Sequence, residues 1–171
     1  ALVSQYLSKN SYRWFLLVEM GLAWTAMLAV PFMYVAFAIN LTPTLILITF
    51  VLLLGSGIGM EIPLISEIIK TPKALPLILF SDYVGGFLGG IAFPLLLFPQ
   101  WGFFSVGAFL AFINSVVGFA FYCLFQKQLE EKEKWLGLAM GLTVLACLIE
   151  FSFAEKLRLF LQNFYFGLPE N

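Results

Sequence analysis

Long apolar runs separated by short polar stretches make up most of this chain. Five such runs can be drawn, with approximate limits at residues 14–39, 45–60, 77–98, 103–125 and 135–153. Pro and Asn in residues 40–44 end the first run, and a Pro-Gln-Trp-Gly turn at residues 99–102 ends the third. Backbone groups cannot stay unpaired in hydrocarbon, so each run is expected to be helical. The pattern predicts an all-α fold, a polytopic transmembrane bundle of about five segments.

Charged residues are missing from two long stretches. No Asp, Glu, Lys or Arg lies between Glu19 and Glu61, and none lies between Asp82 and Lys127. A helix that crosses a bilayer needs about 20 consecutive apolar residues, so each stretch can hold two of them. The surface of a water-soluble domain would not be left so bare. The chain is therefore predicted to be a multi-pass protein of the cell membrane, surrounded by the lipid bilayer.

Basic residues occur in alternate connections between the runs. They precede the first run, separate the second from the third, and separate the fourth from the fifth: Lys9, Arg13, Lys70, Lys73, Lys127, Lys132 and Lys134. The two intervening turns carry no basic residue. By the positive-inside rule, the basic loops are predicted to face the cytoplasm.

Two parts are expected along the chain. Residues 1–153 form the transmembrane helical domain, which we expect to be truncated at its N-terminus because the chain begins without Met. Residues 154–171 form either an interfacial amphipathic helix or a linker to a missing soluble domain. Leu157 and Phe160 share one face of such a helix, and Lys156 falls on the other. The side of the membrane on which the C-terminus lies stays open, as does the oligomeric state.

Composition excludes several classes of function. Hydrophobic residues make up 61% of the chain and charged residues 11%, against about 25% charged in soluble domains. The net charge of −1, with no basic stripe, argues against a nucleic-acid partner. The chain has no His, so its serines have no His partner, and no nucleophile–base pair can be defended. We therefore expect no catalytic residue, no metal site and no cofactor in this chain.

Three acidic residues lie within or at the edges of the apolar runs, namely Glu19, Glu61 and Asp82. A charge at the middle of a membrane helix costs about 2.5 to 3.5 kcal/mol, so such residues invite a functional interpretation. The alternative is a topological role, because Glu19 and Asp82 fall near helix starts, where the helix dipole favours an acid. All three are expected on the cytoplasmic side, with no Lys or Arg at that depth. The hypothesis is that they converge on an acidic vestibule for a cation.

The surroundings of Glu61 predict a break in the second helix, near residues 55–63. Gly55, Gly57 and Gly59 weaken a helix, and Pro63 lacks the N–H that its turn would use. A broken helix with a polar group at the break is a recurring way to build a binding site in a membrane. The alternative is the ordinary end of a helix that enters a loop.

Glycines also cluster in the third run, at Gly85, Gly86, Gly89 and Gly90. They form two overlapping pairs of small residues four positions apart, which lets the backbone of another helix approach closely. We expect a tight helix crossing at this face.

Three short strings resemble a known family. They are Gly-Met-Glu-Ile-Pro-Leu at residues 59–64, Asp-Tyr-x-Gly at residues 82–85 and Phe-Pro-Leu at residues 93–95. In this order and spacing they resemble the integral-membrane domain of bacterial spermidine synthase-like proteins, the polyamine aminopropyltransferases. Residues 5–9 resemble the loop that leaves the second helix of that domain. The resemblance covers nearly the whole chain.

The resemblance implies a role in polyamine biosynthesis. The parent enzyme would transfer an aminopropyl group from decarboxylated S-adenosylmethionine to putrescine, using a soluble catalytic domain C-terminal to this fragment. The role of the membrane part does not follow from the resemblance. Because polycationic amines suit an unpaired acidic cluster electrostatically, the leading hypothesis is that this chain anchors the enzyme and binds polyamines at the cytoplasmic face. Two alternatives stay open: a stand-alone small-molecule or cation transporter whose site is the broken helix, and a passive membrane anchor whose acids only set topology.

Overall fold

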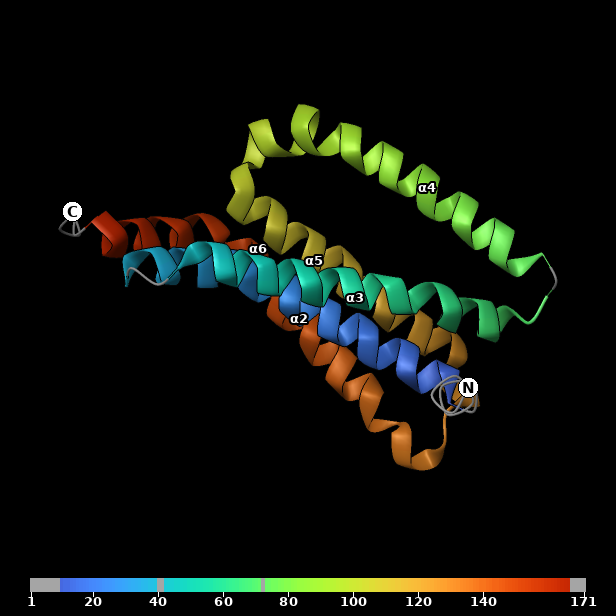
Figure 1. The fold of residues 1–171 in the computed structure, drawn as a ribbon. Helices are drawn as coiled ribbons and strands as arrows, with labels where there is room; N and C mark the ends of the chain where they lie inside the picture. The colour runs from blue at the N-terminus through green and yellow to red at the C-terminus, as the bar shows by residue number, and fades with distance from the viewer. Residues whose placement is uncertain (1–9, 40–41, 72, 167–171) are drawn as a thin grey trace.

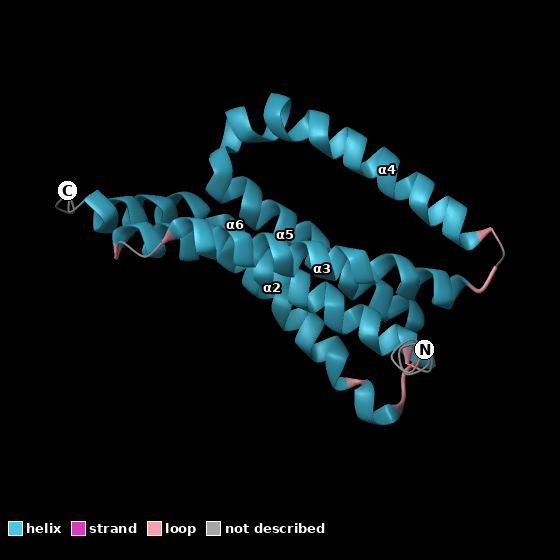
Figure 2. Cartoon of the chain, viewed as in Figure 1, coloured by secondary structure: helices cyan, strands magenta, loops and turns pink. Residues whose placement is uncertain are grey.

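In the computed structural model, residues 10–39, 42–71 and 73–166 are described, and they form long helices joined by short loops (Figure 1). Four helices lie together as a bundle: α2 (Ser11–Ala38), α3 (Pro43–Ile69), α5 (Phe98–Phe125) and α6 (Trp135–Phe166). The fifth long helix, α4 (Ala74–Ala92), stands away from them as an arm. No strand occurs in these ranges (Figure 2). The all-α prediction is confirmed.

The core of the bundle lies between α2, α5 and α6, and three buried clusters follow its length. One end is filled by large side chains, the middle by small ones and the other end by both kinds. The clusters are Leu16, Leu129, Leu136 and Met140; Ala23, Ala111 and Cys147; and Phe104, Ala108, Ala154 and Leu161. Small residues in the middle cluster allow the three helices to approach closely. Helix α3 covers a further side of α2.

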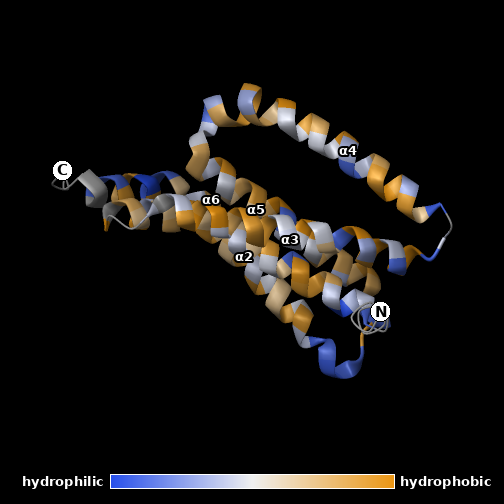
Figure 3. Cartoon of the chain, in the orientation of Figure 1, coloured by the Kyte–Doolittle hydropathy of each residue, from blue (hydrophilic) through white to orange (hydrophobic). Residues whose placement is uncertain are grey.

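Hydropathy separates the long helices from their connections (Figure 3). Hydrophobic residues cover most of the bundle, and hydrophilic residues gather at the loops and at the far end of α6. Large apolar side chains such as Leu52 on α3 and Phe87 on α4 are exposed. Apolar residues on the outer faces as well as in the core are typical of helices that lie in lipid.

The prediction of about five transmembrane segments is not confirmed at that number. Four continuous helices are long and apolar enough to cross a membrane, and one of them is a 55-residue run, Ala74–Gln128. Within that run, α4, the π-helical turn η1 (Phe93–Leu97) and α5 follow one another without a loop. The sequence had suggested a break between its third and fourth segments.

A sharp bend nevertheless divides this run, and the chain turns back on itself there (Figure 1). Pro94 lies in the π-helical turn, where its missing N–H removes a helical hydrogen bond. Gly102 follows with φ 69° and ψ 175°, a conformation that a side chain would disfavour. The bend therefore falls where the sequence places its Pro-rich turn, although the helix continues across it.

The expected break in the second helix is not found, because α3 is continuous from Pro43 to Ile69. Pro63 lies inside the helix and removes a single backbone hydrogen bond, while the bonds of the surrounding turns remain. The glycines at positions 55, 57 and 59 keep helical backbone conformations. The hydrogen bonds of the neighbouring turns thus keep the helix continuous across these residues of low helix propensity.

The glycines of α4 are open rather than packed. A Cβ atom added to Gly85, Gly86, Gly89 or Gly90 would meet nothing within 4 Å. Among the described residues, close helix approach occurs at other glycines. A Cβ on Gly57 of α3 would lie 2.6 Å from Cδ2 of Leu22 on α2, and one on Gly118 of α5 would lie 3.1 Å from Cβ of Glu19. The crossing expected at α4 stays a prediction.

Helix α6 runs past the expected boundary at residue 153 without interruption, to Phe166. Residues 154–166 therefore continue the last long helix, and Ala154 and Leu161 are buried against the rest of the bundle. Residues 167–171 lie outside the described part of the chain. The membrane position expected for residues 154–171 stays a prediction.

Candidate functional site

Glu19 is buried at the junction of α2 and α5, and 4% of its surface is exposed. It lies one turn after Leu16, a residue of the first core cluster, so α2 carries it into the bundle. Gly118 on α5 has no side chain, and this leaves room for the Cβ and Cγ atoms of Glu19. The sequence predicts Glu19 near the start of its helix, close to the membrane surface. In the structure, packing against α5 buries it.

Polar contacts around Glu19 leave part of its carboxylate unsatisfied. The Asn114 side chain on α5 donates a hydrogen bond through Nδ2 to the backbone carbonyl of Glu19, over 3.0 Å. The Oε2 atom of Glu19 is buried and has no hydrogen-bond partner among the described residues. A buried carboxylate oxygen without a donor is costly, so a bound cation or donor would stabilise it.

Glu61 lies near both of the other acids. It lies partly buried on α3, where its charge is close enough to that of Glu19 on α2 for the two to repel each other. It is also repelled by Asp82, which is exposed on α4. The structure therefore brings Glu61 near each of the other acids, one from a neighbouring helix of the bundle and one from the arm.

Packing between α2 and α3 explains why Glu61 faces Glu19. The two helices are antiparallel, and Gly57 lies against Leu22. Residues three or four positions apart share a helix face. Glu61 comes four residues after Gly57, and Glu19 comes three residues before Leu22. Because the helices are antiparallel, both acids lie on the same side of this contact. The missing side chain at Gly57 brings the two backbones close at this level. Gly57 therefore positions the acidic pair, while Gly55 and Gly59 have open space around them.

Four basic residues of the described chain pair with acids other than these three. Ion pairs join Arg13 to Glu133, Lys132 to Glu130, Lys134 to Glu131 and Arg158 to Glu155. Within residues 10–39, 42–71 and 73–166, none of the ion pairs includes Glu19, Glu61 or Asp82. In the same ranges no group of three Asp, Glu, Cys or His side chains is placed to hold one metal ion. Within the described part of the chain, the three acids are thus separate acidic groups without a basic partner.

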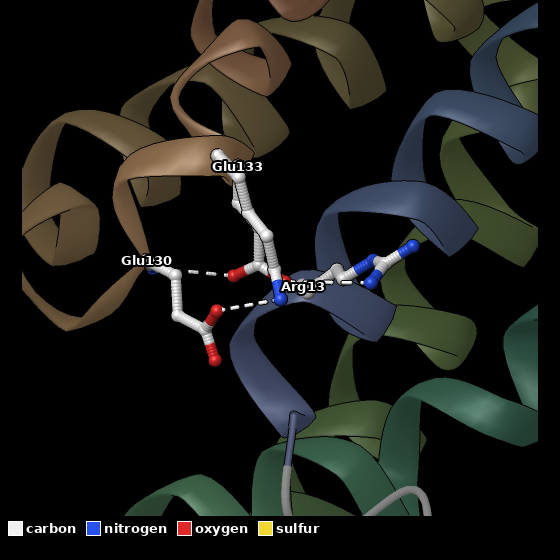
Figure 4. Close-up of polar contacts among 4 residues, drawn as sticks. Arg13, Glu130 and Glu133 are labelled. Atoms are coloured by element: carbon white, nitrogen blue, oxygen red, sulfur yellow. Dashed lines mark hydrogen bonds and ion pairs between the residues drawn. The ribbon is translucent and has the colours of Figure 1, made fainter.

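An ion pair joins the start of α2 to the connection between α5 and α6, at the end of the bundle that carries Glu19, Glu61 and Asp82, here called the acidic cluster (Figure 4). Nη1 of Arg13 lies 3.4 Å from Oε1 of Glu133, which belongs to the short η3 turn (Glu131–Glu133) before α6. The buried Glu133 carboxylate also accepts a hydrogen bond from the backbone N–H of Glu130 over 3.3 Å. This contact ties the start of α2 to the connection between α5 and α6, and thereby holds the helix that carries Glu19.

Sequence reasoning missed Glu150 and Asn114. Glu150 was not among the candidate acids, although it falls inside the run at residues 135–153; it lies at the middle of α6, and its Oε2 atom is buried without a hydrogen-bond partner in the described chain. Its signal was the apolar pattern of residues 151–161, which extends the helix beyond it. Asn114 could be recognised in the sequence as a single amide in a long apolar run. Its hydrogen-bond partner on α2 could not, because the sequence does not show which helices are neighbours.

Comparison with known proteins found relatives that share one name. The chain is 35% identical over 113 residues to polyamine aminopropyltransferase 2 of Streptomyces coelicolor, covering 62% of this chain and 20% of that protein. It is 30% identical over 134 residues to the polyamine aminopropyltransferase of Oceanobacillus iheyensis, covering 71% and 26%. For the Leptospira interrogans protein of the same name the identity is 27% over 158 residues, covering 90% and 31%.

The chain spans less than a third of the length of these curated relatives. No protein-family model and no solved structure matches it. The homologues therefore relate the chain to polyamine aminopropyltransferases, spermidine synthase-like transferases of polyamine biosynthesis, over a part of those proteins.

Proposed function

We propose that this chain is a membrane-spanning part of a spermidine synthase-like aminopropyltransferase, that it anchors the enzyme, and that it binds polyamines at the cytoplasmic face. The observation that carries the proposal is the shared name of the relatives, together with apolar helices in the region that matches them. The transfer reaction itself would take place in a soluble domain C-terminal to the chain, as the resemblance to spermidine synthase-like proteins implies.

Helix length supports five membrane crossings rather than four. A helix rises about 1.5 Å per residue, so the 55-residue run Ala74–Gln128 would be roughly 80 Å long if straight, against a hydrocarbon core of about 30 Å. The bend at Pro94 and Gly102 lets α4 and α5 cross separately. With the basic loops on the cytoplasmic side, the acids at positions 19, 61 and 82 lie toward the cytoplasm in this arrangement.

Separated negative charges suit a linear polyamine. Its ammonium groups are spaced along a flexible apolar chain, so one molecule can approach Glu61 and a neighbouring acid at once. Attraction between opposite charges is stronger in surroundings of low dielectric constant than in water. The unpaired Oε2 of Glu19 would gain a donor on binding.

Polyamine binding is tested by titrating the purified protein in detergent with spermidine. Glu61→Gln should weaken binding by about tenfold, the equivalent of one lost charge-assisted contact of about 1.4 kcal/mol. The matched control is Glu67→Gln, the same change six residues further along α3, which should leave the affinity unaltered. Equal affinities in both variants would contradict polyamine binding and leave anchoring alone.

The anchoring role has its own test. The native reading frame after Asn171 should encode a strand, a Gly-rich turn and a helix with acidic residues, and the encoded enzyme should sediment with membranes. A stop codon directly after Asn171 would contradict the proposed attachment to a catalytic domain.

A further inference from the structure

A cavity of about 680 Å³ lies at the end of the bundle away from the acidic cluster. Its walls come from the end of α2, the start of α3 and the start of α5, with one residue near the end of α6. The end of α2, the start of α3 and the end of α6 lie together near the C-terminus (Figure 1). The volume falls within the range of about 300 to 1,000 Å³ typical of small-molecule sites.

The lining of this cavity is apolar and aromatic along most of its length. It includes the rings of Tyr34, Phe37, Phe50 and Phe103, and the small side chain of Ala29. Among the described residues, no acidic or basic side chain lines it. An amine or another fully charged ligand would therefore lose its water without gaining a partner, whereas a hydrocarbon chain would gain contacts throughout.

Polar groups lie beside the cavity on α6, and we call this side its polar end. Gln162 is the lining residue there, and Arg158, which does not itself line the cavity, lies one helical turn before it on the same face. Arg158 pairs with Glu155 through Nη2, but its Nε atom is buried and has no hydrogen-bond partner among the described residues. An amide donor and a free guanidinium N–H are the groups that bind a phosphate.

Depth places these polar groups at a membrane surface. If α6 enters the hydrocarbon core at Trp135, about 20 residues carry it to the opposite boundary, near Glu155. On α2 the same length leads from Trp14 to Tyr34. Trp and Tyr are enriched at such boundaries. The cavity thus extends into the hydrocarbon, and its polar end lies at the level of the lipid headgroups.

We propose that this cavity binds one acyl chain of a membrane phospholipid, and that Arg158 and Gln162 hold the phosphate of its headgroup. The apolar walls, the polar end and the depth of that end all match this occupant. The inference rests on the proposed membrane crossing and does not depend on polyamine binding at the other end of the bundle.

The experiment uses the full chain, stripped of lipid in detergent and titrated with phosphatidylglycerol, with lipid adducts counted by native mass spectrometry. Ala29→Phe fills the cavity and should weaken phospholipid binding by about tenfold or more, because the acyl chain loses its buried contacts. The matched control is Ala120→Phe at an exposed position of α5, which should bind as the unaltered protein does. Equal affinity in the two variants would overturn the proposal.

Two further measurements address folding and headgroup recognition. Leu47→Trp reaches into the same cavity from a half-exposed position, so it should reproduce the loss even if Ala29→Phe fails to fold. Arg158→Gln should weaken binding of phosphatidylglycerol but not of an uncharged alkyl glycoside. An alkyl glycoside that competes as well as the phospholipid in the unaltered protein would overturn the assignment of the phosphate contacts. Spermidine titration of the same variants should be unchanged, so this proposal and the polyamine site fail separately.

Discussion

At the scale of single residues, the buried acid Glu19 sets the chemistry of the bundle. Its buried Oε2 atom has no hydrogen-bond partner among the described residues, which opposes folding, while the Asn114 side chain donates a hydrogen bond to its backbone carbonyl. A buried carboxylate oxygen without a donor in the described chain is a group that a ligand can satisfy. The proposed ligand is the polyamine, whose ammonium group would supply the missing donor.

Removing the charge of Glu19 should therefore separate stability from binding. Glu19→Gln is expected to raise the free energy of unfolding by about 1 to 2 kcal/mol, because the repulsion with Glu61 disappears and an amide is less costly to bury than a carboxylate. The same variant should bind spermidine more weakly. Both effects can be measured on one preparation, by denaturation in mixed micelles and by titration. A destabilised variant would show that Glu19 has a structural partner after all.

At the scale of helices, glycines decide how closely elements approach. Gly57 and Gly118 lie against side chains of α2, whereas the glycines of α4 face open space. The motif on α4 has the more familiar spacing, yet the contacts within the chain occur at isolated glycines. The spacing of glycines along one helix shows which face of the helix lacks side chains. Whether another helix packs against that face depends on where the neighbouring helix lies.

This difference gives a matched pair of substitutions. Gly57→Leu should destabilise the bundle by about 1 to 3 kcal/mol, because the new side chain would overlap Leu22 and force α3 away from α2. Gly89→Leu should change the free energy of unfolding by less than about 0.5 kcal/mol, since nothing lies within 4 Å of the added Cβ. Denaturation monitored by circular dichroism compares the two. The opposite order would mean that α4 is packed through its glycines.

At the scale of the whole molecule, the arrangement of α4 and α5 decides the topology. Five crossings place the bend near Gly102 and the loop before α6 on opposite sides of the membrane. Four crossings require the long run from α4 to α5 to behave as one span, although it is far longer than a bilayer core.

Labelling of single cysteines tests this topology in intact cells. With Cys123 and Cys147 replaced by Ser and Ala, Gln100→Cys should react with an impermeant maleimide from outside. Lys132→Cys should react only after the membrane is permeabilised. Reaction of both positions from the same side would exclude a double crossing by α4 and α5.

The sequence by itself determined the class of structure. Runs of apolar residues long enough for a bilayer, with charges confined to their ends, permit only helices, and all described elements except short turns and loops are helical. It also located the acids at positions 19, 61 and 82 and the bend near residue 102. These features depend on local composition, which the order of residues contains.

The tertiary structure decided which residues meet. The break expected in α3 did not form, because hydrogen bonds of adjacent turns hold a helix across one proline and several glycines. The approach of Glu61 to Glu19, the burial of the Oε2 atom of Glu150 at mid-helix and the cavity at the far end all depend on how α2, α3, α5 and α6 are placed around one another. Helices that are apolar on every side can pack in many registers, and only close contacts such as Gly57 with Leu22 select one of them.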